Sequence, residues 1–427
     1  MERKKFIKAG LGAVLAGTLP YSWGKPKNGA NSIDTIDVSN WEKIREAFPL
    51  KPGLHFLNNG TMGITPFPVI ESVNNAFTQI AENAAYPHHN KELETLLAQT
   101  VGCLPEEIGI TKNVSEGINH IAWGVPLKPG DEVLITQHEH IGGCAAWMRR
   151  SQLEGIKVKA VPIGSSSEEC LSIIANAISP DTKVIAVPHI PCTIGQILPV
   201  KEICALARKK GIISVLDGAH PLGMITFNLH EIDCDYYAGC FHKWMFGPIG
   251  SGWLYIKKDR IEQTKITHVA AYSVNAFDMS AQPPEMDTPI LEASRYAYGT
   301  FSGPHIAGCK TALEWYQHVG PERIEKRVKQ LNSYLRGTLE NAGNKVQILN
   351  ANEAQSQGGQ LGFKILKGLN KDSKSQQGFV SFARKNGLIL RYVGENKIDC
   401  IRVSTHYYNT ESEIDRLFEL LKKYAWD

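Results

Sequence analysis

The middle of the chain alternates short, almost continuously apolar segments with stretches of helical periodicity. Four apolar segments occupy residues 132–136, 158–163, 183–190 and 212–217. The stretch 200–210 has helical spacing and ends on Lys-Lys-Gly, cations followed by a helix-capping glycine. Strands without a polar face are typical of parallel sheets with helices on both sides. The sequence therefore predicts an α/β fold with a mostly parallel sheet.

The chain is long enough for more than one domain. It has 427 residues, 43% of them hydrophobic and 21% charged, the composition of a globular protein. After residue 303 the pattern changes to a long helical stretch, short strands and a final helix. We expect a short N-terminal segment over 31–55, a large domain over 56–303 and a smaller C-terminal α+β domain over 304–427. The formal net charge is +3, with no basic stripe, so nucleic acid is not an expected partner.

The cysteines and histidines predict no metal site. Nine cysteines are present, none of them in a C-x-x-C pair, and no Cys/His spacing is typical of zinc. An odd number leaves at least one thiol free. Most are expected to be small buried apolar residues.

The first 30 residues are typical of a targeting segment. Residues 3–8 read RKKFIK, and an apolar run over 9–19 follows that is too short to span a bilayer comfortably. The basic part resembles a twin-arginine export signal with Lys at the second arginine, and no Ala-x-Ala cleavage site follows. We expect a periplasmic or exported protein that uses the export machinery. If the segment is an ordinary basic terminus, the protein is cytoplasmic.

Four polar residues stand near the ends of predicted strands or the starts of helices, and a fifth, Arg402, lies within a predicted strand over 398–405. Pyridoxal 5'-phosphate (PLP) needs a lysine for a Schiff base, a carboxylate at its ring nitrogen, a helix N-terminus for its phosphate and a flat side chain over its ring. An amino-acid substrate needs an arginine for its carboxylate. Lys243, Asp217, Ser115, His140 and Arg402 can supply these groups in that order. Taken singly, each residue also suits an ordinary capping or surface role.

Several motifs together resemble the class V aminotransferase family of fold-type I PLP-dependent enzymes. The segments are SEGIN at 115–119, EH at 139–140, DGAH at 217–220, HKWMFGPIGSGWLY at 242–255 and RVSTHYYNT at 402–410. They are most similar to isopenicillin-N epimerase-like and cysteine desulfurase-like members. The resemblance implies the fold-type I transferase fold, whose large lobe has a mostly parallel seven-stranded sheet flanked by helices, with a smaller C-terminal α+β lobe.

The same resemblance implies further site residues. Ser115 and His242 are expected at the cofactor phosphate, with Glu116 beside them, and His220 near the cofactor O3′ atom. Thr300 is expected to reach the phosphate of the neighbouring subunit's cofactor, which implies a homodimer with shared active sites. Lys243 is both the cofactor lysine and the catalytic base.

Two departures from the family pattern bear on the reaction. Cys240 replaces a serine that desulfurases usually carry, and Cys192 stands where many members have Asn or Ser. Desulfurases also carry a nucleophilic cysteine on a long loop, whereas residues 393–397 form a short segment without one. A persulfide mechanism through that loop is disfavoured.

The expected activity is the conversion of an amino acid through an external aldimine and abstraction of its α-proton. The reaction is aminotransferase-like or epimerase-like; the alternative is a C–S or C–Se lyase or a cysteine desulfurase. A dinucleotide-dependent oxidoreductase is excluded because no G-x-G-x-x-G follows an early strand. The presence of Lys243 and Asp217 argues against a non-catalytic PLP-binding scaffold.

Overall fold

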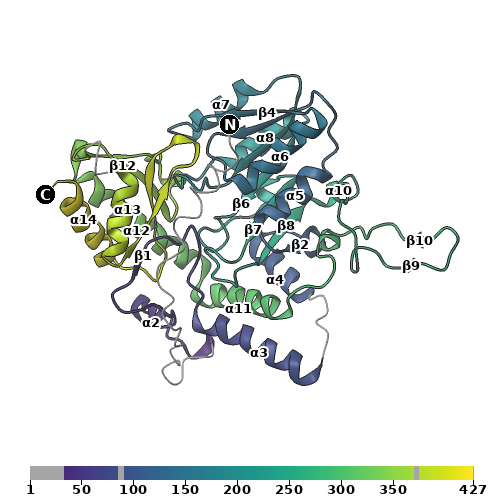
Figure 1. The fold of residues 1–427 in the computed structure, drawn as a ribbon, viewed down its shortest axis with the longest axis horizontal. Helices are drawn as coiled ribbons and strands as arrows, with labels where there is room; N and C mark the ends of the chain where they lie inside the picture. The colour runs from purple at the N-terminus through teal and green to yellow at the C-terminus, as the bar shows by residue number, and fades with distance from the viewer. Residues whose placement is uncertain (1–32, 85–90, 370–374, 427) are drawn as a thin grey trace, which may run out of the picture.

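The computed structural model describes residues 33–84, 91–369 and 375–426. A large lobe with a twisted sheet and a smaller C-terminal lobe lie side by side (Figure 1). The export signal predicted at 1–30 lies outside the described residues.

The large lobe is built on a seven-stranded sheet. Its spatial order is β2-β8-β7-β6-β5-β3-β4. The strands are β2 (Ile108–Thr111), β3 (Glu132–Thr136), β4 (Lys157–Val161), β5 (Thr182–Pro188), β6 (Ile213–Gly218), β7 (Tyr236–Cys240) and β8 (Gly252–Ile256). From β7 to β4 all neighbours are parallel, and β8 is antiparallel to both β7 and β2. This arrangement confirms the predicted α/β fold with a mostly parallel sheet.

Helices cover both faces of this sheet because successive strand residues point to opposite sides. In β6, Val215 packs in a cluster with α5 and α6, whereas Leu216 packs in a second cluster with helices of the other face. The helices of the large lobe are α3 (Phe67–Asn83), α4 (Lys91–Val101), α5 (Val114–Gly124), α6 (Ile141–Glu154), α7 (Ser167–Ala177), α8 (Val200–Lys209), α9 (Leu229–Ile232) and α10 (Lys258–Ile261). The two-sided packing explains why the strands read as continuous apolar runs.

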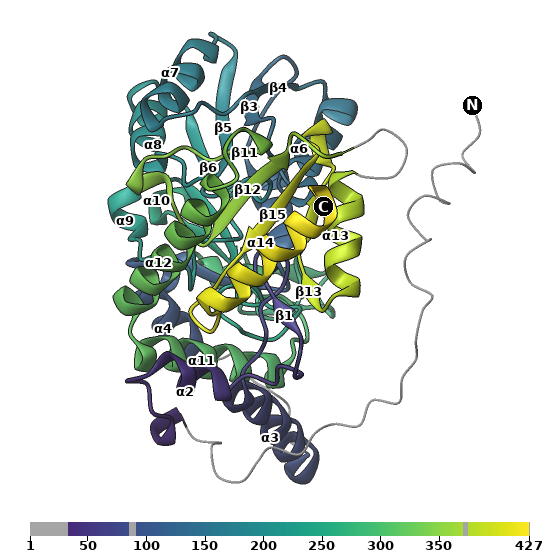
Figure 2. The ribbon, with the colours of Figure 1, turned by 90° about the vertical axis from the view of Figure 1, so that its left-hand side faces the viewer.

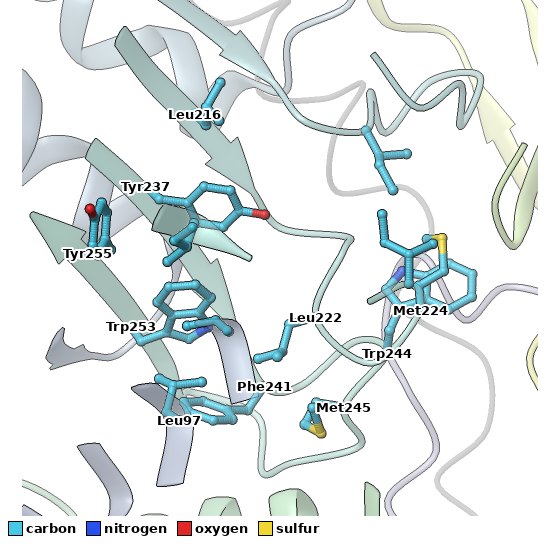
Figure 3. Packing of buried hydrophobic residues seen from close by; sticks show 14 of the residues in the cluster. Leu97, Leu216, Leu222, Met224, Tyr237, Phe241, Trp244, Met245, Trp253 and Tyr255 are labelled. Atoms are coloured by element: carbon cyan, nitrogen blue, oxygen red, sulfur yellow. The ribbon is translucent and has the colours of Figure 1, made fainter. Parts of the chain in front are cut away.

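The loop after β7 is held in the larger of the two clusters. Phe241, Trp244 and Met245 are buried and belong to the same cluster as Met224 and Trp253 (Figure 3). Large apolar side chains on both sides of Lys243 therefore fix the backbone that carries this lysine.

The smaller lobe contains a four-stranded antiparallel sheet of order β11-β12-β15-β14. Its strands are β11 (Val346–Ile348), β12 (Gln360–Ile365), β14 (Arg391–Val393) and β15 (Cys400–Ser404). Helices α12 (Pro321–Glu340), α13 (Gln376–Lys385) and α14 (Glu411–Ala425) pack with it in one apolar cluster (Figure 2). The lobe is the α+β unit that the sequence predicts.

The packing of two elements does not follow the domain boundaries expected at 56 and 304. Strand β1 (His55–Phe56) pairs in parallel with β13 (Leu388–Ile389) of the smaller lobe. Helix α11 (Gly303–Val319) packs mainly against α3 and α4 of the large lobe. By packing, the change from one lobe to the other falls nearer to Gly320 than to Gly303.

Short elements complete the chain. A two-stranded hairpin of β9 (Phe277–Asp278) and β10 (Glu285–Met286) projects away from the large lobe (Figure 1). The remaining elements are α2 (Trp41–Glu46) and the 3₁₀ turns η1 (Ile33–Thr35), η2 (Pro105–Glu107), η3 (Ala293–Tyr296), η4 (Gly343–Lys345), η5 (Ala354–Ser356) and η6 (Glu395–Lys397).

The described residues hold no disulfide and no membrane-spanning helix. All nine cysteines are free, and eight of them are buried, in agreement with their expected role as small apolar residues. None of the helices within 33–84, 91–369 and 375–426 has the length and apolarity needed to cross a bilayer.

Candidate active site

The predicted site residues gather at the carboxyl edge of the large sheet. Asp217 lies at the end of β6, and Lys243 follows the end of β7. Ser115 lies in the first turn of α5, which Asn113 caps by accepting the Glu116 N–H. His140 caps α6 just after β3. Open α/β sheets bind ligands at this edge, because successive loops converge there.

Lys243 contacts a buried histidine. Its Nζ lies 3.4 Å from Nε2 of His220. The other ring nitrogen of His220, Nδ1, lies 3.1 Å from Nε1 of Trp244 and 2.6 Å from Nε2 of Gln360. Burial lowers the pKa of His220 well below its usual value, with a further contribution from the charge of Lys243.

Asp217 is a buried carboxylate with one oxygen facing the site. Its Oδ1 accepts the Ala219 N–H at 2.9 Å, and no described residue donates to Oδ2. Burial raises the pKa of Asp217, whereas Lys243 and the Ala219 N–H act in the opposite direction. Gly143 passes so close that a Cβ on it would come within 2.8 Å of Oδ2. A larger residue at this position would have to displace the Asp217 oxygen.

Glu139 is a second buried carboxyl next to Asp217. Its Oε1 accepts both the N–H and the hydroxyl of Thr136, at 3.1 and 2.8 Å. Burial, with a smaller contribution from Asp217, raises the pKa of Glu139 to about 8. The site thus holds two neighbouring carboxyls, Glu139 and Asp217, whose pKa values are both raised by burial.

Helices α5 and α6 meet closely at their N-termini. A Cβ on Gly142 would lie 2.2 Å from the hydroxyl of Ser115, so the hydroxyl sits directly against the backbone of α6. His140 accepts the Gly142 N–H through Nδ1, and burial lowers its pKa. Two helix N-termini with a hydroxyl between them form an electropositive place for an anion.

His242 is fixed in one orientation. Its Nδ1 lies 3.3 Å from the carbonyl oxygen of Ser251, which can only accept, so Nδ1 carries the proton. Its backbone carbonyl also accepts the N–H of Gly63, at 2.8 Å.

Arg402 enters the site from β15 of the smaller lobe and is fully buried. Its Nη1 donates to the Cys192 carbonyl at 2.7 Å, and its Nη2 donates to Asn58 Oδ1 and Thr61 Oγ1 at 3.0 and 2.8 Å. Its Nε has no hydrogen-bond partner among the described residues. Burial, followed by the charge of Arg391, lowers the pKa of Arg402 to about 9.

Glu116 and Thr300 both line a neighbouring cavity of about 330 Å³. Lys112, Tyr298 and His305 also line it. Glu116 is used within its own turn, where Oε2 accepts the Lys112 N–H at 2.6 Å. The contacts of Lys243 described above involve neither residue.

The sequence did not single out five residues that contact this group: Trp244, Gln360, Asn58, Thr61 and Arg391. Trp244 lies inside a quoted motif, and its position next to Lys243 was the available signal. Gln360, Asn58 and Thr61 come from distant parts of the chain, and no local pattern marks them.

The fold and these side chains define a fold-type I PLP-dependent enzyme. The Aminotransferase class-V family model matches residues 64–417, and the chain therefore belongs to the class V aminotransferase family. Its cofactor is PLP.

Curated relatives of two activities cover nearly the whole chain. Isopenicillin N epimerase of Streptomyces clavuligerus is 26% identical over 406 residues, which are 90% of this chain and 98% of that protein. A probable cysteine desulfurase of Methanothermobacter thermautotrophicus is 25% identical, with the same coverage.

Solved structures agree on the fold. A variant of C-DES with glycine covalently linked to its PLP is 27% identical, with a TM-score of 0.79 over 89% of this chain and 99% of that one. The complex of the cystine C-S lyase C-DES with cysteine persulfide gives the same TM-score at 26% identity, over 88% of this chain and 100% of that one.

The residues present fit PLP. The side chain of Asp217 is largely buried, and its Oδ2 accepts no hydrogen bond from a described residue; the protonated ring nitrogen of PLP would supply a donor. The N-termini of α5 and α6 lie on the same side of the site and suit a phosphate.

Proposed function

We propose that this protein converts an amino acid by removing its α-proton, with PLP held as a Schiff base on Lys243. The observation that carries the proposal is the convergence of Lys243, the free oxygen of Asp217 and the buried Arg402 at one sheet edge. Bound PLP supplies an electron sink for the negative charge that develops at the α-carbon.

The chain's own residues then have separable tasks. Asp217 holds the proton on the cofactor ring nitrogen, and His140 covers the ring. Ser115 and His242, with the N–H groups at the start of α5, bind the phosphate. Lys243 Nζ takes the α-proton, which is general base catalysis by a positioned amine.

Arg402 is the proposed binding group for the substrate α-carboxylate. Its present partners are a carbonyl, an amide and a hydroxyl, all of them uncharged. A buried guanidinium without an anionic partner is costly, and a carboxylate offsets that cost through charge-assisted hydrogen bonds. The free Nε leaves a donor for it.

Aminotransferase-like or epimerase-like chemistry is the leading form of this proposal. The epimerase relative supports it. The alternative, a C–S lyase or cysteine desulfurase, is supported by the desulfurase relatives and by the similarity to C-DES.

A desulfurase that uses a persulfide on the loop after β14 is not favoured. The segment from Gly394 to Asp399 contains no cysteine. Cys400 is buried in β15, with its Sγ 3.9 Å from the Thr193 carbonyl oxygen, and burial raises its thiol pKa to about 12. A thiol in that state is a poor nucleophile. A lyase that needs no protein thiol remains compatible with the site.

One assay separates these reactions. Purified protein with PLP is incubated in D₂O with a panel of L- and D-amino acids, including cysteine and cystine. Deuterium at the α-carbon supports the shared step. Inversion then identifies an epimerase, an oxo acid identifies an aminotransferase, and sulfide or persulfide identifies a lyase. Failure of every amino acid to exchange its α-proton contradicts the proposal, with Lys243→Ala as the blank.

We further propose a homodimer with shared active sites. The hairpin β9–β10 carries exposed Phe277, Met279 and Met286, and such apolar patches on a projecting arm suit a partner surface. A second copy would bring Thr300 toward the partner's phosphate site. Mixing inactive Lys243→Ala and Thr300→Arg chains restores activity if sites are shared, because one hybrid site has both native residues. No restoration, or a monomeric mass by light scattering, contradicts this arrangement.

A further inference from the structure

His220 is surrounded by three nitrogen atoms and almost no solvent. Its side chain is 2% exposed. Nδ1 faces Nε1 of Trp244 at 3.1 Å and Nε2 of Gln360 at 2.6 Å, whereas Nε2 faces Nζ of Lys243 at 3.4 Å. The three neighbours come from the lysine loop and, in the case of Gln360, from β12 of the smaller lobe.

The Trp244 contact decides where the His220 proton lies. An indole N–H can only donate, so Nδ1 must accept and carries no proton. A neutral imidazole with a bare Nδ1 has its proton on Nε2. The Gln360 amide N–H donates to the same Nδ1, and the deep burial of the ring keeps the doubly protonated form unfavourable.

We propose that Trp244 and Gln360 are positioning residues that hold His220 as the Nε2–H tautomer, with that proton directed at the Lys243 nitrogen. This inference rests on the proposed role of Lys243 as the cofactor lysine. The Nε2–H donates to an atom with a lone pair or negative charge, and an ammonium has no lone pair to receive it. The donor therefore favours a Lys243 nitrogen that carries a lone pair, the form that can act as a base or bind the cofactor, over the ammonium.

Through Gln360, the smaller lobe also helps to determine which nitrogen of His220 carries the proton. Gln360 is 1% exposed and lies on β12, where its backbone carbonyl accepts an N–H from the Asn332 side-chain amide at 3.0 Å. Gly195 adopts φ +80°, and a Cβ on it would lie 2.2 Å from Cβ of Gln360. The close fit holds the amide against His220 only when the two lobes are seated together.

Two variants reverse or remove the donors. Gln360→Glu has nearly the same shape but places an acceptor at Nδ1, which draws a proton to that nitrogen. Trp244→Phe removes the indole N–H and keeps an aromatic ring in the core. The matched control is Trp315→Phe, which removes another buried indole N–H, donated to the Tyr407 hydroxyl at 2.7 Å, outside this group.

The test has a readout that does not depend on turnover. In holoenzyme with ¹⁵N-labelled histidine, assigned with His220→Gln, wild type and Trp315→Phe are expected to show an unprotonated Nδ1 and a protonated Nε2. Gln360→Glu is expected to show a protonated Nδ1, a shifted pH midpoint of the visible PLP absorption, and a loss of kcat of about tenfold or more.

A wild-type His220 with its proton on Nδ1 would overturn the proposal. Retention of the wild-type tautomer in both Gln360→Glu and Trp244→Phe would also overturn it. The labelling experiment on Lys243 described below fails separately if the proposed function is wrong, because the ¹⁵N signals of His220 report the tautomer whichever lysine holds the cofactor.

Discussion

Arg391 and Arg402 lie directly opposite each other on β14 and β15. Like charges in such cross-strand pairs are destabilising. Arg391 is paired with Glu395, whereas Arg402 is buried among uncharged acceptors, and the charge of Arg391 contributes to its lowered pKa. The smaller lobe therefore presents a positive surface to the site that a carboxylate ligand would stabilise.

Arg402→Lys is expected to raise KM about tenfold or more and to lower kcat as well. Lysine keeps the charge but cannot make two parallel hydrogen bonds, so both affinity and orientation are lost. Steady-state kinetics with any confirmed amino-acid substrate measures this. Arg150→Lys is the control, since Arg150 is buried and donates to the Val125 carbonyl outside the site. Unchanged KM and kcat in Arg402→Lys would leave it a purely structural residue.

Lys243 is expected to be the single lysine labelled when the holoenzyme is reduced with borohydride. Reduction converts the Schiff base into a stable secondary amine that survives digestion. Peptide mapping by mass spectrometry locates the label, and Lys201→Ala serves as a control at an exposed lysine. A pyridoxyl group on any other lysine would overturn the assignment of the whole site.

Asp217→Asn is expected to keep the cofactor but to slow α-proton exchange by about 10²–10³-fold. The amide cannot keep the ring nitrogen protonated, so the electron sink is weakened. Exchange of the substrate α-proton into D₂O measures the step directly. Asp235→Asn is the matched control, a buried carboxylate that accepts from Ser214. Near-normal exchange in Asp217→Asn would contradict its role.

Glu139→Gln is expected to remove a pH dependence of stability. The pKa of Glu139 is raised from 4.5 to about 8, so between these values the folded chain holds a proton that the unfolded chain releases. The wild-type free energy of unfolding therefore falls as pH rises through this window, by at most about 1.4 kcal/mol per pH unit from this group.

Urea unfolding at about pH 5 and about pH 8 compares the variant with wild type. Glu139→Gln is expected to gain stability relative to wild type as pH rises. Glu107→Gln, a change at another buried carboxyl, is the control. A constant difference between Glu139→Gln and wild type at both pH values would show that Glu139 is ionised in the folded protein.

The N-terminal segment is expected to direct export of a folded protein. Fused to a reporter that works only after folded export, residues 1–30 should give activity that is lost when Arg3 and Lys4 become Gln. Lys25→Gln and Lys27→Gln test whether charge alone is responsible. A reporter that stays inactive with the intact segment would reject export by this route.

The sequence predicted the parts of this molecule that local patterns encode. The strands at β3, β5 and β6 were expected from apolar runs, and the structure places them within a few residues of the predicted bounds. The hairpin β9–β10 has strands of two exposed residues each, too short for any periodicity.

The residues of the candidate site also fall into those that local patterns mark and those that they do not. Asp217 and Lys243 follow predicted strands, so their meeting at one sheet edge could be expected. Gln360 reaches His220 across 140 residues of sequence and from another lobe. Such a contact depends on how two separately packed lobes fit, which no local spacing encodes.

The ties between distant segments also bear on the order in which the protein becomes functional during synthesis. The side-chain amide of Asn59 donates a hydrogen bond to the Lys243 carbonyl at 3.4 Å. The backbone of Asn58 forms an isolated parallel β-bridge with Ser404, at the end of β15. A nascent chain that ends before β15 already contains Asp217 and Lys243 but lacks Arg402 and the strand end that pairs with Asn58. Full assembly of the ligand site therefore cannot precede the synthesis and folding of β15.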